Sequence, residues 1–466
     1  MSGEAKFLTG SPLRHVVVMS ATSSVGLMAV FIVDLVDMLF ISMLGQAELA
    51  AAIGYAGAIL FLTTSVSIAM AIAAGALVAR NLGSGDTERA RQIATHVLVF
   101  GFALSVAFAV LVWLNINTLA ALMGAKGETL RLAALYLSII IPSMPLLMLG
   151  MAGSAILRAH GDARRSMMAT VGGGIVNAVL DPILIFGLDL DLAGAALASV
   201  AARVTIMGLA LWPVIRVYRG LAPFHVPAFA KDLSAITALA APAMLTNLAT
   251  PIGSAYVTRA MAEFGEAAVA GMAIVGRLTP VAFALIFALS GAVGPIIGQN
   301  FGAGLIHRVR ETFKDALIFT GLYIALASLL LFVLRAPIAD AFGATGETRT
   351  LVYLFCGPLA LAWFFNGVIF VGNAGFNNLG HPLYSTGINW GRNTLGTIPF
   401  VAVGAALYGA PGVLIGQAAG GIIFAGISQY CAQRLIHQLE SGQAPVRERP
   451  HFSRRARLLQ LFEHRR

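Results

Sequence analysis

Charged residues are scarce in this 466-residue chain. Asp, Glu, Lys and Arg together make up 11% of it, whereas 58% of the residues are hydrophobic. Soluble domains carry about 25% charged residues, so this composition excludes an ordinary soluble protein. Cysteine is nearly absent too. Cys356 and Cys431 both lie inside apolar runs, and we expect them to be small buried side chains rather than a disulfide.

Twelve apolar stretches follow one another along the chain, each long enough to cross a hydrocarbon core of about 30 Å. They are residues 15–44, 49–79, 93–117, 130–152, 166–188, 192–215, 233–262, 267–298, 315–335, 350–374, 383–407 and 411–433. The polar start is short and the first stretch is too long for a signal peptide, so we expect this helix to be retained. The sequence predicts an all-α membrane protein with twelve transmembrane helices.

The net charge of +9 is unevenly distributed, which favours a membrane orientation over nucleic-acid binding. If the side holding the N-terminus is called inside, few basic residues fall on the other side: Lys126, Arg131, Arg259, Arg335 and Arg349. Basic residues concentrate on the cytoplasmic side of membrane proteins. We therefore expect a multi-pass protein of the inner (plasma) membrane with both termini cytoplasmic. Its expected partners are the lipid bilayer and small organic substrates, with no nucleic acid, and its expected state is a monomer.

An internal repeat organises the chain. GAKGET at residues 124–129 returns as GATGET at 343–348, an offset of 219, and the same offset places Gly161 on Gly380. Six helices per half make both halves start on the same side, so we predict two pseudo-symmetric six-helix bundles in a parallel repeat around a central cavity. The predicted regions are an N-terminal bundle carrying a coupling-ion site, a cytoplasmic linker, a C-terminal bundle and a basic cytoplasmic tail: residues 1–216, 217–232, 233–433 and 434–466.

Two glycine-rich loops occupy repeated positions, at residues 83–85 and 302–304. The same offset matches the paired arginines that follow them: Arg89 and Arg91 with Arg308 and Arg310. A phosphate-binding loop would need a preceding strand and a following Lys-Ser/Thr, and neither is present. We interpret both loops as tight turns with basic residues that anchor the inside face.

Two carboxylates stand in the first apolar stretch, Val16 to Gly45. Asp34 and Asp37 are three residues apart and therefore share a helical face. An ionised Asp at mid-membrane costs on the order of 3 kcal/mol. We would not expect two such residues in a helix that served only as a membrane anchor. One interpretation places them at a helix end near the headgroups. We favour the other, an ion or proton site facing a water-filled cavity.

The fifth stretch adds Asn177 and Asp181, one helical turn apart, followed by Pro182, which removes a backbone hydrogen bond. The alternative is that Asn177 only caps Asp181 or joins helices. Ser199 lies on a small-residue face of the sixth stretch. With Asp37, these side chains supply oxygens suited to a proton or equally to Na⁺, which would then bind at Asp37, Asn177 and Asp181. The second half lacks acids at the matching positions.

The second half instead carries a membrane-embedded cation, Arg277. We predict that Arg277 lies in the substrate cavity and pairs with Asp37 across it, because unpaired charges in apolar spans are costly. The alternative is that Arg277 reaches the outer headgroups. Arg392 is interpreted as a structural residue that binds carbonyl groups. Candidate cargo-lining side chains are aromatic or thioether groups: Met272, Phe283, Phe287, Trp363, Phe364 and Phe365.

Several stretches together resemble the multidrug and toxic compound extrusion (MATE) family over nearly the whole chain. They are LVDMLFISMLG, ALVARNLGSGD, LRAHGDARRSMM, NAVLDPILIFG and VGPIIGQNFGAG. The resemblance implies that Asp37 is the family's first-helix acid, that Asn177 and Asp181 are its fifth-helix pair, and that Ser199 is its sixth-helix hydroxyl. Because the seventh- and tenth-helix acids are missing, the chain is similar to the DinF-like branch. Asp34 has no counterpart in that pattern.

The resemblance implies a transporter, not an enzyme. It implies an efflux antiporter that exports organic, often cationic, compounds in exchange for H⁺ or Na⁺ by alternating access, with no cofactor besides that ion. The alternative is a lipid-linked precursor flippase or another transporter of the same superfamily. A major-facilitator protein would need a basic motif that the loop at 80–86 matches poorly, and no zinc pair or Ser–His arrangement supports a membrane enzyme.

Overall fold

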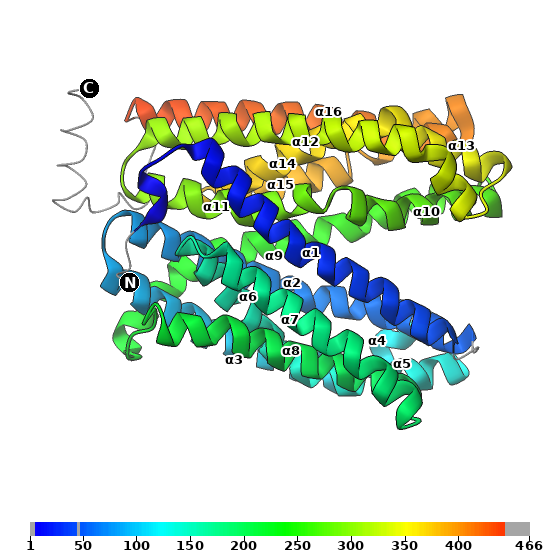
Figure 1. Ribbon diagram of the computed structural model, residues 1–466, viewed down its shortest axis with the longest axis horizontal. Coiled ribbons are helices and arrows are strands. Elements are labelled where there is room, and N and C mark those ends of the chain that lie inside the picture. Colours follow the sequence, from blue (N-terminus) through cyan, green and yellow to red (C-terminus); the bar gives the residue numbers. More distant parts are fainter. Residues whose placement is uncertain (1–4, 44–46, 443–466) are drawn as a thin grey trace. The chain divides into compact units, whose positions relative to one another are not determined.

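The computed structural model describes residues 5–43 and 47–442. Every regular element in these ranges is a helix (Figure 1), which confirms the predicted all-α class. The helices of the first half are η1 (Lys6–Leu8), α1 (Pro12–Met43), α2 (Ala47–Gly83), α3 (Thr87–Leu114), α4 (Ile116–Leu122), α5 (Gly127–Ile140), η2 (Ile141–Ser143), α6 (Met144–Ala159), α7 (Ala163–Pro182), η3 (Ile183–Gly187) and α8 (Asp191–Arg216).

The second half continues with a further set of helices. These are α9 (Val226–Ala262), α10 (Glu266–Ala282), α11 (Ala284–Gly302), α12 (Ile306–Ala341), α13 (Gly346–Leu354), η4 (Phe355–Leu359), α14 (Ala360–Asn378), α15 (Pro382–Asn393) and α16 (Ile398–Glu440). Proline and glycine explain several interruptions. Regular α-helical bonding in α7 ends at Pro182 and gives way to the π-turn η3, and η4 contains Gly357 and Pro358.

The chain divides into two compact units. The first consists mainly of Val25–Met244, and the second of Phe7–Ser24 together with the described chain from Leu245 onward. Each dividing point lies within a continuous helix, between Ser24 and Val25 in α1 and between Met244 and Leu245 in α9. The first helix of each half of the sequence therefore begins in one unit and ends in the other.

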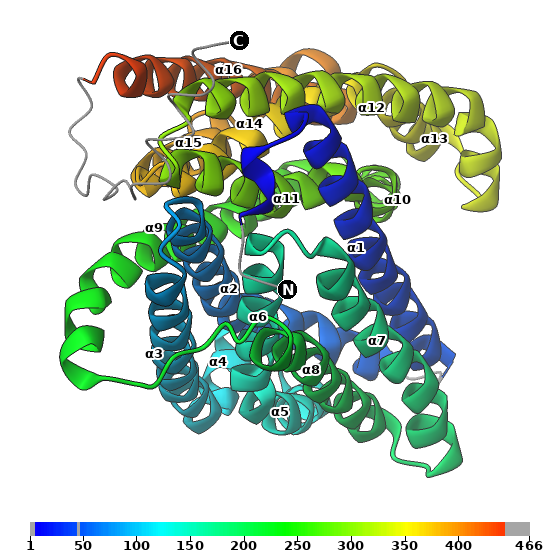
Figure 2. The same cartoon turned by 60° about the vertical axis from the view of Figure 1, so that its left-hand side comes forward.

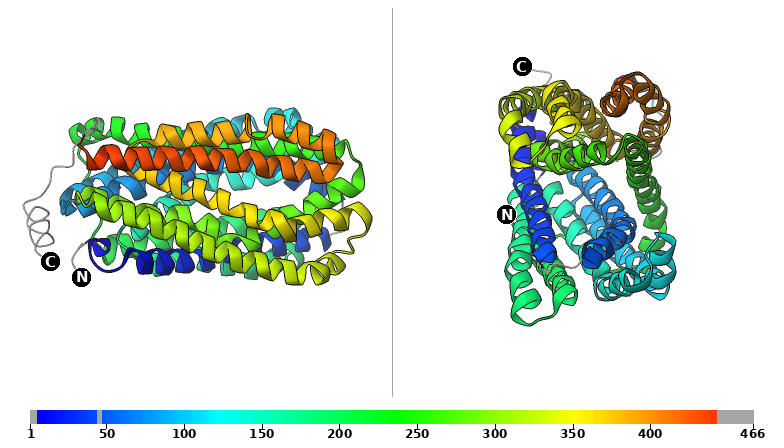
Figure 3. Two further views of the ribbon diagram at one scale, coloured as in Figure 1. Left: turned by 90° about the horizontal axis from the view of Figure 1, so that it is seen from above. Right: turned by 90° about the vertical axis from the view of Figure 1, so that its right-hand side faces the viewer.

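Eleven segments of the described chain are helical, long and apolar enough to cross a membrane. The last of them, Pro382–Glu440, is 59 residues long, and its backbone leaves the helical conformation at Gly409, where φ is 63° and ψ is −142°. This residue separates two antiparallel parts of α16, which lie side by side in Figure 3. The segment therefore crosses twice, and the twelve-helix prediction is confirmed.

Glycines allow the two parts of α16 to approach at backbone distance. A Cβ atom on Gly404 would lie 2.1 Å from the carbonyl oxygen of Gly412, and one on Gly416 would lie 2.2 Å from that of Phe400. Any larger side chain would push the two parts apart. Close packing of this kind drives helix association in lipid, where apolar burial adds little.

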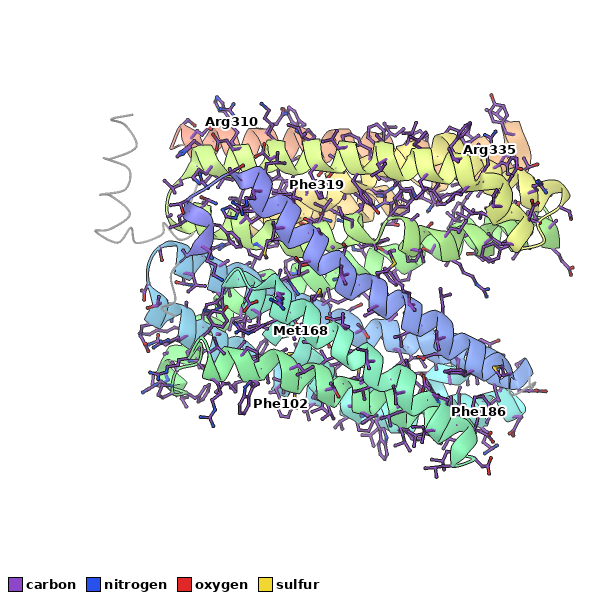
Figure 4. The ribbon with its side chains drawn as sticks, viewed as in Figure 1. Phe102, Met168, Phe186, Arg310, Phe319 and Arg335 are labelled. Atoms are coloured by element: carbon purple, nitrogen blue, oxygen red, sulfur yellow. The ribbon has the colours of Figure 1, made fainter. Side chains whose placement is uncertain are left out.

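The sequence repeat is also a repeat of backbone conformation. Gly85 and Gly304, in the two glycine-rich loops, have φ of 79° and 76°, a left-handed conformation that glycine adopts without strain. These values confirm the predicted tight turns. Large apolar side chains on the helices of the first unit are exposed, as expected for a surface in contact with lipid; Phe102, Met168 and Phe186 are examples (Figure 4).

Candidate functional site

One amide joins the two acids that the sequence singles out in the first unit. Nδ2 of Asn177 donates to Oδ1 of Asp37 at 3.1 Å and to Oδ2 of Asp181 at 2.7 Å. The carboxyl groups of Asp37 and Asp181 are therefore neighbours, because both accept from the same amide nitrogen. The structure therefore brings together residues that are 140 positions apart in the sequence.

Packing of α7 against its neighbours fixes this arrangement. A Cβ atom on Gly174 would contact Val33 of α1 at 3.2 Å, whereas one on Gly173 would lie 2.3 Å from Ile206 of α8. The run of glycines therefore lets α7 approach α1 and α8 closely. Asn177 and Asp181, one and two turns further along α7, are buried as a result, and Asp37 is half-buried.

The site has more acceptors than donors. The Asn177 amide serves both acids, and Oδ1 of Asp181 is buried and accepts no hydrogen bond from the protein residues that the structure describes. Two carboxylates that share one amide nitrogen repel each other when both are ionised, and the repulsion is stronger in a medium of low dielectric constant. A proton or a monovalent cation between them would remove the repulsion and supply the missing partner. The donor set therefore fits either ion.

The other predicted members of the site lie around this cluster. Ser199 of α8 and its neighbour Tyr136 of α5 are both half-buried, and Tyr136 also lies near Asp37 and Asp181. Asp34, three residues before Asp37 on α1, is exposed. The sequence analysis missed Tyr136.

Arg203 was also missed, although it stands well inside an apolar span, as Arg277 does. Its Nη1 donates to the carbonyl oxygen of Ile140 at 3.0 Å and to Oγ of Ser143 at 2.7 Å. These groups flank Pro142, where α5 gives way to η2. Arg203 therefore binds the helix break next to the turn that carries Tyr136, and a search for every arginine inside an apolar span would have found it.

The predicted cargo-lining residues belong to the second unit. Phe283 is fully buried and stacks on Trp363, with ring centroids 4.8 Å apart, and Phe287 lies against the same indole at 5.7 Å. Phe364 and Phe365 pack edge to face at 5.5 Å. These contacts form an aromatic cluster, and its contact with cargo stays a prediction.

Met272 and Arg277 lie on α10, and neither side chain is fully buried. Met272 is half-buried and packs against a core cluster that includes Val257 and Leu351. Arg277 is exposed. Because Arg277 belongs to the second unit and Asp37 to the first, the predicted pairing of these two charges stays a prediction.

Several known proteins of similar sequence or structure are described as membrane transporters. An FAD transporter of Shewanella oneidensis is 28% identical over 444 residues, which cover 94% of this chain and 98% of that protein. The multidrug export protein MepA of Staphylococcus aureus is 24% identical over 84% of this chain and 86% of its own length. The crystal structure of the Vibrio cholerae MATE transporter VcmN has 25% identity and a TM-score of 0.87, covering 92% of this chain and 97% of that one.

The family comparison also reproduces the internal repeat. The MatE family matches residues 23–183 and again residues 242–403, so the two matches begin 219 residues apart, as the sequence repeat does. Together they span more than half of the chain. This chain therefore belongs to the MATE family of membrane transporters and is not an enzyme.

Proposed function

We propose that this chain is an efflux antiporter that exports organic compounds, often cations, in exchange for H⁺ or Na⁺ by alternating access. The observation that carries the proposal is the bridging of Asp37 and Asp181 by the Asn177 amide among membrane helices. Acids at membrane depth are costly and mark ion pathways. This pair also has an acceptor that no described protein group satisfies.

Occupancy of the pair would couple the ion to the conformation of the helices. Asp37 lies on α1 and Asp181 on α7. When the pair is empty, the two carboxylates repel, and the repulsion favours separation of these helices. A bound proton or Na⁺ reverses that preference. Coupling requires such a difference in ion affinity between two conformations.

The proposed setting follows from the basic residues of the chain. We place the protein in the inner (plasma) membrane as a monomer. Both termini are proposed to be cytoplasmic, because basic segments are retained on that side. No cofactor other than the coupling ion is part of the proposal. Absence of acids from the seventh and tenth spans supports the DinF-like branch.

A second candidate cargo is an anionic nucleotide. The relatives include both a multidrug export protein and an FAD transporter. The observation in favour of an anion is Arg203, a guanidinium in a membrane helix whose hydrogen bonds described above go to a carbonyl and a hydroxyl rather than to a carboxylate. A phosphate is a suitable partner for such a group.

Proteoliposomes test the ion and the cargo separately. Purified protein is reconstituted with a fluorescent organic cation or with FAD, and a pH gradient and a Na⁺ gradient are imposed one at a time. We expect one gradient to drive transport, and we expect Asp37→Asn and Asp181→Asn to abolish it while the protein remains folded and inserted. Asp189→Asn is the matched control, because this exposed loop residue has φ of 51°, which Asn tolerates.

Two outcomes would contradict the proposal. Wild-type transport in both acid variants would show that the coupling site is misassigned. Movement of a lipid-linked precursor across the bilayer, with neither soluble cargo transported under either gradient, would favour the flippase alternative.

A further inference from the structure

The repeated arginines Arg89 and Arg308 make buried contacts that neither positive-inside anchoring nor ion coupling explains. Arg89, near the start of α3, forms a two-pronged ion pair with Asp232. Its Nη1 donates to Oδ2 at 2.9 Å and its Nη2 donates to Oδ1. Nδ1 of His96 lies 2.6 Å from the same Oδ2. The side chain of Asp232 is only 2% exposed, so this carboxylate depends on these partners for its charge compensation.

This ion pair is one of several contacts that hold the linker of residues 217–232 to the first unit. Tyr218 donates its hydroxyl to Oδ2 of Asp162 at 2.7 Å. Oγ1 of Thr95 accepts from the backbone N–H of Ala222 and donates to its carbonyl, both at 3.0 Å. Figure 2 shows the linker passing from α8 to α3 before α9 begins. The linker is therefore held at Tyr218, Ala222 and Asp232.

Aromatic side chains pack against His96, the histidine next to Asp232. The rings of Phe224 and Phe229 lie on either side of the sequence position at which the linker enters α9, and each has its centroid 5.7 Å from that of His96. Nε2 of His96 is buried and has no hydrogen-bond partner among the described residues. His96 is thus enclosed by residues of the linker and of the first turns of α9.

Arg308 makes the equivalent contact in the second unit. Its Nη2 donates to the carbonyl oxygens of Phe7 at 3.1 Å and Gly10 at 2.9 Å, and its Nε donates to Oδ1 of Asn300 at 3.0 Å. The backbone N–H of Phe7 donates to Oε1 of Gln299 at 2.9 Å. The segment that precedes α1 is therefore held by α11 and α12.

The two contacts are reciprocal. Arg89 comes from the first half of the sequence and holds the segment that starts α9, the first helix of the second half. Arg308 comes from the second half and holds the segment that starts α1, the first helix of the first half. The adjacent repeated pair behaves differently: Arg91 lies 3.6 Å from Glu88 of its own helix, and Arg310 lies 3.3 Å from Glu440.

We propose that Arg89 and Arg308 form two reciprocal clasps that stay closed throughout the transport cycle. The first clasp consists of Arg89, His96 and Asp232, and the second of Arg308, Asn300 and the carbonyls of Phe7 and Gly10. Each clasp makes the start of one half's first helix part of the other unit. That the clasps stay closed during a transport cycle rests on the proposed antiport function, whereas the contacts themselves do not depend on transport. Opening the first clasp would leave a buried carboxylate without its counter-charge, and opening the second would leave the carbonyl of the buried residue Phe7 without donors.

Limited trypsin digestion tests the first clasp without a transport assay. Arg219 is an exposed site in the stretch before α9, and Lys231 is an exposed site in the first turns of α9, next to Asp232. Cleavage of a docked segment follows the population of its open form. We expect Arg89→Gln and Asp232→Asn each to speed cleavage at these sites by about tenfold, and the double variant to add little, because both remove one interaction. Arg91→Gln is the matched control. Equal cleavage of Arg89→Gln and Arg91→Gln would overturn the first clasp.

The second clasp has a parallel test. Lys6 and Arg14 are exposed on either side of the segment that Arg308 holds. We expect Arg308→Gln to speed cleavage there, while the matched control Arg310→Gln, whose position is visible near the start of α12 in Figure 4, leaves it unchanged. Equal cleavage in the two variants would overturn the second clasp.

A disulfide tests whether the first clasp stays closed during transport. Thr95→Cys and Ala222→Cys, in a protein whose Cys356 and Cys431 are replaced by Ala, would join α3 to the linker. We expect the oxidised protein to transport at the rate of its reduced form. Arrest on oxidation that a reductant reverses would show that the clasp must open. If no variant transports, the antiport proposal fails, and digestion under each imposed ion condition still decides whether the clasp stays closed.

Discussion

The two units bury different kinds of polar side chain. In the first, the carboxyl groups of Asp37 and Asp181 share the Asn177 amide. In the second, Nδ2 of Asn389 donates to Oδ1 of Asn373 at 3.0 Å. The other buried side-chain amides described in that unit are Gln299, Asn300, Asn377, Asn378 and Asn393, and none of its described buried side chains is an acid.

This difference separates two tasks that polar groups perform inside a membrane. Amides hydrogen-bond across helices without changing charge, so they hold the second unit in the same state at any pH or Na⁺ concentration. Carboxylates change charge when they bind a proton or a cation. We infer that the ion acts on the first unit, and that the second unit supplies a constant framework. The following variants test that division.

The largest effect is expected when the first unit is made to resemble the second. Asp37→Asn or Asp181→Asn replaces a chargeable group by an amide of the same shape. We expect ion-driven transport to be abolished, which means a fall of at least about 100-fold, the upper range of coupling between two sites. Gradient-driven uptake into proteoliposomes measures this. A variant that retains its ion dependence would show that the charge of the first unit is not the coupling element.

The reverse change, Asn389→Asp, places an acid in the framework of the second unit. We expect a loss of about 3 kcal/mol in stability at neutral pH, because the new carboxylate would be buried without a cation. Thermal unfolding in detergent at several pH values measures it. Asn117→Asp, at an exposed position of α4, is the control. A stable protein with a new ion dependence would contradict the framework role.

A smaller effect is expected from Arg203→Met. This change removes the donors to Ile140 and Ser143 at the break after α5, and we expect it to cost about 2 kcal/mol of stability. Arg203→Lys should recover part of the loss, because an ammonium retains the charge but not the fork of the guanidinium. Thermal unfolding distinguishes the two. A selective loss of FAD transport in Arg203→Met would instead support the nucleotide cargo.

The smallest effect is expected from a change in pH, which acts on a histidine outside the membrane spans. Burial lowers the pKa of His160, and its Nδ1 bonds the carbonyl of Ile156. The neutral imidazole is therefore the folded form, and its stabilisation is complete above the ordinary value of about 6.5 and declines as the pH falls below it. We expect cleavage at Arg219 to rise a few-fold from pH 7.5 to 5.5. The offset of 219 places His160 on Leu379 in the second unit, and a leucine side chain does not titrate.

The hydrogen-bonded pair of the Asp162 carboxylate and the Tyr218 hydroxyl nearby should not contribute to that rise. Although burial opposes its charge, hydrogen bonds from Tyr218 and Arg165 hold the pKa of Asp162 below its usual value, and burial with the same hydrogen bond raises that of Tyr218 to about 12. Stabilisation by the Asp162 carboxylate is therefore present above about pH 4 and lost only below it. His160→Gln should remove the pH effect, and a persisting rise in that variant would assign it elsewhere.

The features that the sequence predicted are those visible along one helix. An acid in an apolar span is conspicuous on composition alone, and the four-residue spacing of Asn177 and Asp181 places them together on one face. Their grouping with Asp37, on another helix, was predicted because all of them are polar oxygen groups in apolar spans, and the family resemblance implied the same grouping. Arg89 and Arg308 were recognised as repeated positions but interpreted as anchors, because their partners depend on tertiary contacts: Asp232 is 143 residues from Arg89, and Phe7 is 301 residues from Arg308.

The reversal at Gly409 constrains how the protein is made. The last two membrane segments are joined by a single non-helical residue and contact each other through glycine backbones. Such a pair leaves no external loop to be exported ahead of the final helix. We expect the two segments to leave the insertion machinery together, as a preformed hairpin, and an epitope tag placed at Gly409 to block biogenesis rather than report topology.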